Sequence, residues 1–183
     1  MQMEIETRDD GMTILRGYVN AVERDSRLLP KSMAKEAKRS FYERIREKTF
    51  ARALEKGENI LFKFNHGRTI GDTASGSLKL EEDSIGLKAE ATTDDPEVRQ
   101  AAQEGKLTGW SFGFLAKKAT WENAGRYDRR TIEEMDLKEV SILTKTPAYI
   151  GTSIEMRSYD EEQETANTEN FRRLVSVMKL KRK

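Results

Sequence analysis

The sequence contains no cysteine and only one histidine, His66. Without cysteine the chain can form no disulfide, no thiolate nucleophile, no zinc–cysteine site and no cysteine-ligated iron–sulfur cluster. A single histidine also excludes motifs that need two, such as the HExxH pair of metalloproteases. An acid–base enzyme built on this chain would use His66 near neutral pH, or a carboxylate or lysine with a shifted pKa. We expect neither a cofactor nor a bound metal.

Long apolar runs and a dominant charge are also missing. No run approaches the roughly 20 residues of a membrane span, and the first residues (MQMEIETRDDG) are acidic where a signal peptide is basic and then apolar. The 33 Lys+Arg residues almost balance the 32 Asp+Glu residues, so the net charge is +1. Nothing in this balance favours nucleic acid or an anionic membrane as a partner. We expect a soluble protein made in a cytoplasm.

What is present fits one mostly β domain followed by a tail. A chain of 183 residues favours a single domain of ordinary size. We place this α+β domain at residues 1–158, with two or so helices. Residues 159–183 begin as an almost purely polar linker and end in FRRLVSVMKLKRK. The i, i+3, i+4, i+7 spacing of its apolar residues predicts an amphipathic helix with a basic end, which we interpret as a partner-docking helix rather than the domain's own last helix.

The first half of the chain predicts strands around a polar surface segment. Residues 12–22 are rich in β-formers, residues 23–40 are polar with a short helix after Pro30, and residues 41–45 fit a strand or a helix. Thr49 is expected to cap a short helix that ends at Gly57. In Asn59–His66 the alternation predicts a strand with Phe62 and His66 on one face and Lys63 on the other.

The second half predicts a hairpin, a helix and further strands. Residues 76–80 and 86–92 alternate around EEDSI, and Asp95-Pro96 is typical of a helix start. Residues 107–116 (LTGWSFGFLA) alternate aromatics with small residues, which favours a core-facing aromatic side over a base-stacking platform. Residues 130–143 predict one or two strands, and a last short strand is expected near residues 153–156.

Three residues on different predicted strands could form a catalytic triad. A serine hydroxyl becomes a nucleophile when a neighbouring imidazole takes its proton, and a carboxylate fixes the tautomer of that imidazole. Ser111, His66 and Glu139 could supply these roles, with Gly109 and Gly113 leaving room for a substrate backbone. Each also has a plainer interpretation: a structural histidine, a small outward-facing serine and a solvated acid. Asp136 is the main rival for the acid, although on a regular strand it would lie on the face opposite Glu139.

At these segments the chain resembles the prohead (head maturation) proteases of tailed phages, distant relatives of the herpesvirus assembly proteases. The matching pieces cover about residues 13–158 and are, in order, LRGYVNAV, FYERIREKTF, FKFNHG, the GxLxL…GLxAEA hairpin, GKLTGWSFGF, EEMDLKEVSIL with TPAY, and GTSIEMRS. The resemblance implies a small β-barrel serine endopeptidase with His66 as base, Ser111 as nucleophile and Glu139 as the acid. The herpesvirus relatives use a second histidine in the third role, which is impossible here because His66 is the only one.

The resemblance also implies a place and partners. The protease would be packaged inside the immature prohead in the bacterial host cytoplasm, where it cleaves the scaffold region of the phage capsid protein, or a separate scaffold, and finally itself. Neither nucleic acid nor membrane is expected as a partner, and a homo-oligomer is left open. A non-enzymatic capsid-assembly or scaffold-binding module on the same fold is the alternative. A glycoside hydrolase is weaker, because no pair of acids lies in an apolar setting.

Overall fold

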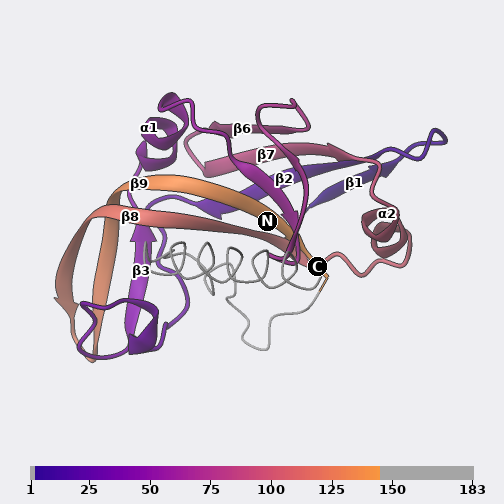
Figure 1. Ribbon diagram of the computed structural model, residues 1–183. Helices are drawn as coiled ribbons and strands as arrows, with labels where there is room; N and C mark the ends of the chain where they lie inside the picture. The colour runs from indigo at the N-terminus through magenta and orange to yellow at the C-terminus, as the bar shows by residue number, and fades with distance from the viewer. Residues whose placement is uncertain (1–2, 145–183) are drawn as a thin grey trace, which may run out of the picture.

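The computed structural model describes residues 3–144, which fold as two β-sheets with two α-helices (Figure 1). The predictions for residues 147–149, the strand near 153–156 and the tail at 159–183 lie outside this range. The first sheet is antiparallel, in the order β1 (Glu4–Thr7), β2 (Thr13–Ala21), β7 (Gly86–Thr93), β6 (Leu78–Glu82). The second has the order β3 (Phe41–Ile45), β9 (Tyr127–Leu143), β4 (Leu61–Phe64), β5 (Arg68–Asp72), with β8 (Gly109–Ala124) also paired to β9. The mostly β prediction is confirmed, and the closed, herpesvirus-like barrel stays a prediction.

β9 organises the second sheet. It runs antiparallel to β8 along nearly its whole length, and Figure 1 shows the two strands side by side, curving together. The first part of β9 is parallel to β3, and its last part is parallel to β4. Because β4 and β8 both pair with β9, the registers of these two pairings place side chains of β4 and β8 next to those of β9.

Aromatic side chains fill the core shared by the two sheets. Phe112 stacks on Phe114 with ring centroids 5.5 Å apart and meets the edge of Phe50 at 5.3 Å. Phe62 lies 6.0 Å from Trp110, and all five rings are buried. The prediction that the aromatic side of residues 107–116 faces the core is therefore confirmed, and the small residues that alternate with these rings lie on the other face of β8.

The helices fit their predicted positions with one error. In α2 (Pro96–Gln103) Asp95 accepts bonds from the backbone N–H groups of Glu97 and Val98, as the sequence predicts. The short helix after Pro30 is the 3-10 turn Lys31–Met33. For α1 (Thr49–Glu55) the prediction of Thr49 as the cap is wrong, because Lys48 is the N-cap residue, in left-handed conformation, and Thr49 is inside the helix. Its buried hydroxyl instead donates to the carbonyl of Glu133 on β9, at 3.3 Å.

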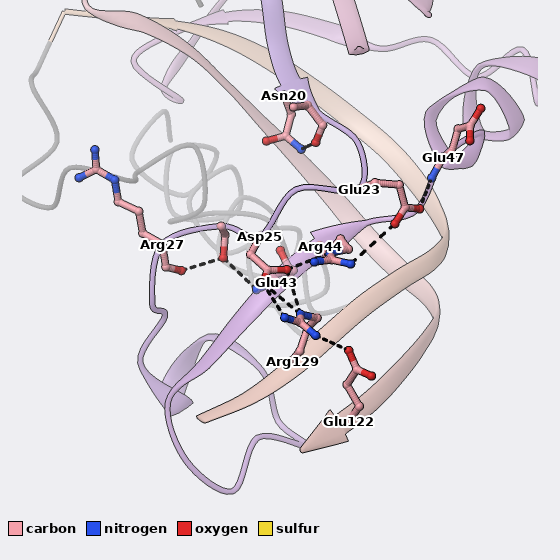
Figure 2. Close-up of polar contacts among 11 residues, drawn as sticks. Asn20, Glu23, Asp25, Arg27, Glu43, Arg44, Glu47, Glu122 and Arg129 are labelled. Carbon is pink, nitrogen blue, oxygen red and sulfur yellow. Dashed lines mark hydrogen bonds and ion pairs between the residues drawn. The ribbon is translucent and has the colours of Figure 1, made fainter. Parts of the chain in front are cut away.

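Residues 41–45, for which the sequence allowed a strand or a helix, form the strand β3. The polar segment at residues 23–29 lies along the outer edge of this strand. Its backbone pairs with β3 through Ser26 and Leu29, whose N–H groups donate to Glu43 and Phe41. Figure 2 shows Asp25 between two arginines: Nε of Arg44 donates to it at 2.8 Å, and Nη2 of Arg129 at 2.8 Å. This covers an edge strand that would otherwise present unpaired backbone groups.

Candidate active site

His66 lies in the tight turn between β4 and β5, a strand that the sequence did not reveal. Asn65 and His66 both have positive φ (52° and 59°), and Gly67 N–H closes the turn on the carbonyl of Phe64 at 3.1 Å. The Asn65 side chain fixes the turn to the end of β9, because its Oδ1 accepts the backbone N–H of Thr144 at 2.9 Å. The predicted strand therefore stops at Phe64. His66 does not share a face with Phe62, and the turn redirects its ring toward β9.

The ring of His66 meets Glu139. Nδ1 of His66 lies 2.7 Å from Oε1 of Glu139, whose side chain is 1% exposed. The other carboxylate oxygen, Oε2, is 2.8 Å from Nζ of Lys63. Burial by itself raises the pKa of Glu139, but the contact with His66 and the ion pair with Lys63 outweigh it and hold that pKa below its ordinary value. The lowered pKa favours the ionised form of Glu139, which can accept a hydrogen bond from Nδ1 of His66.

Ser111 shares a sheet face with this pair. In the register, Ser111 on β8 is opposite Ser141 on β9, and Ser141 is opposite Lys63 on β4. Residues opposite one another point to the same side of a sheet, and Glu139 is two residues before Ser141 on that same side. Ser141 Oγ donates to Oε1 of Glu139 at 3.5 Å. Ser111 itself has no exposed surface.

A comparison with protein families identifies the family of the chain that carries this site. The model described as caudovirus prohead serine protease matches residues 1–168 of the chain. The chain belongs to this family. Searches among curated proteins and among solved structures gave no significant match. Membership links the chain to capsid maturation in tailed phages and supports a role as a serine peptidase.

Small residues lie on β8 on the same side as Ser111. Gly113 is the register partner of Glu139 on β8, and Gly109 is two residues from Ser111 on the same side. A Cβ added to Gly109 would meet no atom within 4 Å. The open space is thus at Gly109, whereas Ser111 itself is fully buried, and room for a substrate backbone beside the serine stays a prediction.

The carboxylate of Asp136 is held by lysines, since Nζ of Lys56 lies 2.7 Å from it and Nζ of Lys117 lies 3.1 Å from it.

 The sequence argument against Asp136 was wrong in its premise, because β9 has a bulge at Lys138: Gly113 pairs with Glu139, while the next residue, Phe114, pairs with Leu137. The extra residue returns Asp136 to the face of Glu139. Burial by itself raises the pKa of Asp136. The contacts with Lys56 and Lys117 outweigh this effect and hold that pKa below its ordinary value.

Two residues of this site, Lys63 and Asn65, have contacts that the sequence does not predict. Lys63 was assigned to the strand face opposite His66, and only the positive-φ turn brings both side chains to one carboxylate. Asn65 fixes that turn through Thr144. The one signal for Asn65 was its residue type, since asparagine tolerates left-handed conformation better than most residues.

Among residues 3–144 no group of three or more His, Cys, Asp or Glu side chains could hold a metal, and no helix there could span a membrane.

Proposed function

We propose that this member of the prohead protease family is a serine endopeptidase in which Ser111 is the nucleophile, His66 the general base and Glu139 the acid that orients the imidazole. The observation that carries the proposal is the 2.7 Å contact between Nδ1 of His66 and Oε1 of the buried Glu139. An ionised carboxylate at Nδ1 favours the tautomer with its proton there. That tautomer leaves the lone pair of Nε2 available to accept a proton from serine.

The chemistry follows from these roles. Ser111 Oγ attacks the carbonyl carbon of the scissile peptide as its proton passes to Nε2 of His66, and a tetrahedral oxyanion forms. The imidazolium, stabilised by Glu139, then gives that proton to the leaving amine, and the acyl-enzyme remains. Water, deprotonated by the same imidazole, releases the new carboxylate and regenerates Ser111. Because Ser111 is fully buried, a peptide reaches it only when this sheet face opens.

The substrates follow from the family and belong to the same proposal. We infer that the enzyme acts inside the immature prohead in the bacterial host cytoplasm, where it cleaves the scaffold region of the capsid protein, or a separate scaffold, and itself. The family's role in capsid maturation supports this assignment. The open space at Gly109, next to Ser111, supports an extended peptide as the substrate.

The test is co-expression of the full chain with the phage capsid protein, followed by mass spectrometry of both proteins. Wild type is expected to shorten the capsid protein, and Ser111→Ala to leave it intact while keeping the wild-type circular dichroism spectrum. Ser84→Ala, in the exposed β6–β7 turn, is the control and should cleave like wild type. Cleavage by Ser111→Ala but not by Ser141→Ala would move the nucleophile to Ser141. An intact capsid protein with wild type would favour the non-enzymatic assembly module.

A further inference from the structure

Lys63 reaches the buried acid of the site from the neighbouring strand. In the parallel register of β4 and β9, Leu61 is opposite Glu139 and Lys63 is opposite Ser141. Lys63 is therefore the diagonal neighbour of Glu139 on the same face, a spacing that a long side chain can bridge. Its Nζ is 2.8 Å from Oε2, and its side chain is only 13% exposed.

The carboxylate of Glu139 is thus shared between two partners. Oε1 faces Nδ1 of His66 and Oε2 faces Nζ of Lys63, so the two contacts fix both the position and the rotation of the group. A carboxylate that is 1% exposed needs such partners to stay ionised, because burial disfavours its charge. With His66 neutral, the charges of Lys63 and Glu139 cancel. Without Lys63, the buried pair would carry one negative charge, which an added proton on the imidazole would neutralise.

Other charged groups near this face have partners of their own. On β9, Lys138 is 2.8 Å from Glu58, and Asp136 is bound by Lys56 and Lys117. On β5, Arg68 pairs with Asp95 and Glu97. The β8 residues opposite this part of β9, Ser111 and Gly113, carry no charge.

We propose that Lys63 is a positioning residue of the peptidase: it holds Glu139 with Oε1 toward His66, and its positive charge offsets the negative charge of that carboxylate beside the imidazole. The inference rests on the proposed function of His66, Ser111 and Glu139. Lys63 is in the same cross-strand row as Ser111, with Ser141 between them, which also raises a serine–lysine dyad. The ion pair with Glu139 argues against that dyad, because a base must be unprotonated whereas this ammonium is stabilised by the carboxylate.

The experiment measures the rate at which a fluorophosphonate probe labels Ser111 in the purified full-length chain, as a function of pH. This readout needs no known peptide substrate, and Ser111→Ala gives the background. Lys63→Met is expected to label about tenfold more slowly at neutral pH, with the acidic limb of its pH profile moved upward by about one pH unit. Lys63→Arg, which keeps the charge, should restore the position of that limb. Lys138→Met is the matched control, since it removes an exposed lysine next to Glu139 in sequence, and should match wild type.

Each outcome has a distinct meaning. A wild-type rate with an unmoved acidic limb in Lys63→Met would overturn the inference and leave the proposed function standing. No labelling of wild type above the Ser111→Ala background, together with an intact co-expressed capsid protein, would instead overturn the proposed function. Labelling that survives His66→Ala but not Lys63→Arg would make Lys63 the base.

Two further variants cover a failure to fold. If Lys63→Met does not fold, Lys63→Gln gives the same comparison with a neutral hydrogen-bonding side chain. Both neutral variants could fail to fold while Lys63→Arg folds. If the pH profile of Lys63→Arg is then the same with Glu139 as with Glu139→Gln, Lys63 has a purely structural role and the inference is overturned. In a folded series, Lys63→Met should slow labelling much less in a Glu139→Gln background than in wild type, because the positioning acts through Glu139.

Discussion

Nδ1 of His66 lies 2.7 Å from Oε1 of Glu139, although 73 residues separate the two in sequence. The contact depends on a turn with two residues of positive φ at the end of β4 and on the parallel pairing of β4 with β9. Apolar packing alone does not explain the turn or the pairing, because both direct polar side chains to a buried position.

The identity of the catalytic acid can be tested by Glu139→Gln. The amide can keep a hydrogen bond to the imidazole but favours the wrong tautomer, so we expect kcat/KM for capsid-protein cleavage to fall about 10⁴-fold. Asp136→Asn is the matched control on the same strand and face, and it should retain near wild-type kcat/KM. The opposite ranking of the two variants would assign the third role to Asp136.

The stability of the fold should depend on pH through Glu139. The pKa of Glu139 is lowered in the folded chain, so its ionised form stabilises the fold above the unfolded value of 4.5, and this contribution is lost as pH falls through the folded pKa. Urea unfolding of wild type and Glu139→Gln should give a free-energy difference that is largest near neutral pH and shrinks below about pH 4.5. A difference that stays constant down to acid pH would show that the charge of Glu139 does not stabilise the fold.

The turn that carries His66 can be tested at Asn65. Asn65→Ala removes the bond to Thr144 and leaves a residue with a Cβ in left-handed conformation, while Asn65→Gly removes the bond alone. We expect both to lower kcat/KM, and urea unfolding to show Asn65→Ala the less stable by about 1 kcal/mol. Wild-type kcat/KM in both variants would mean that the bond to Thr144 does not position His66.

The ion cluster of Figure 2 should contribute to stability and not to catalysis. Asp25 accepts bonds from Arg44 and Arg129 at the end of β9 away from Glu139. We expect Asp25→Asn to lower the free energy of unfolding by about 1 kcal/mol, since the side chains are partly exposed, and to leave kcat/KM unchanged. A changed KM at unchanged stability would indicate that residues 23–29 contact the substrate.

The sequence predicted the elements of this site better than their connections. Alternation in NILFKFNH and GWSFGF predicted the strands that carry Lys63 and Ser111, because one face of each is buried in the core. It could not predict the positive-φ turn at Asn65-His66 or the bulge at Lys138, which break the period of two. Those two irregularities determine which side chains meet Glu139, and they depend on pairings between distant segments. The catalytic roles of His66, Ser111 and Glu139 stay predictions.

Because Lys63, Glu139 and Ser111 are on three adjacent strands, their meeting depends on a single register. A slip of β9 by one residue would turn Glu139 toward the aromatic core and bring Val140 or Ile142 to the opposite face. A copy of the chain with β9 mispaired would therefore lack the acid–base pair altogether. Under the proposed function, the hydrogen-bond ladder that completes the sheet also acts as a safeguard, since a copy with β9 mispaired would lack the contact between His66 and Glu139.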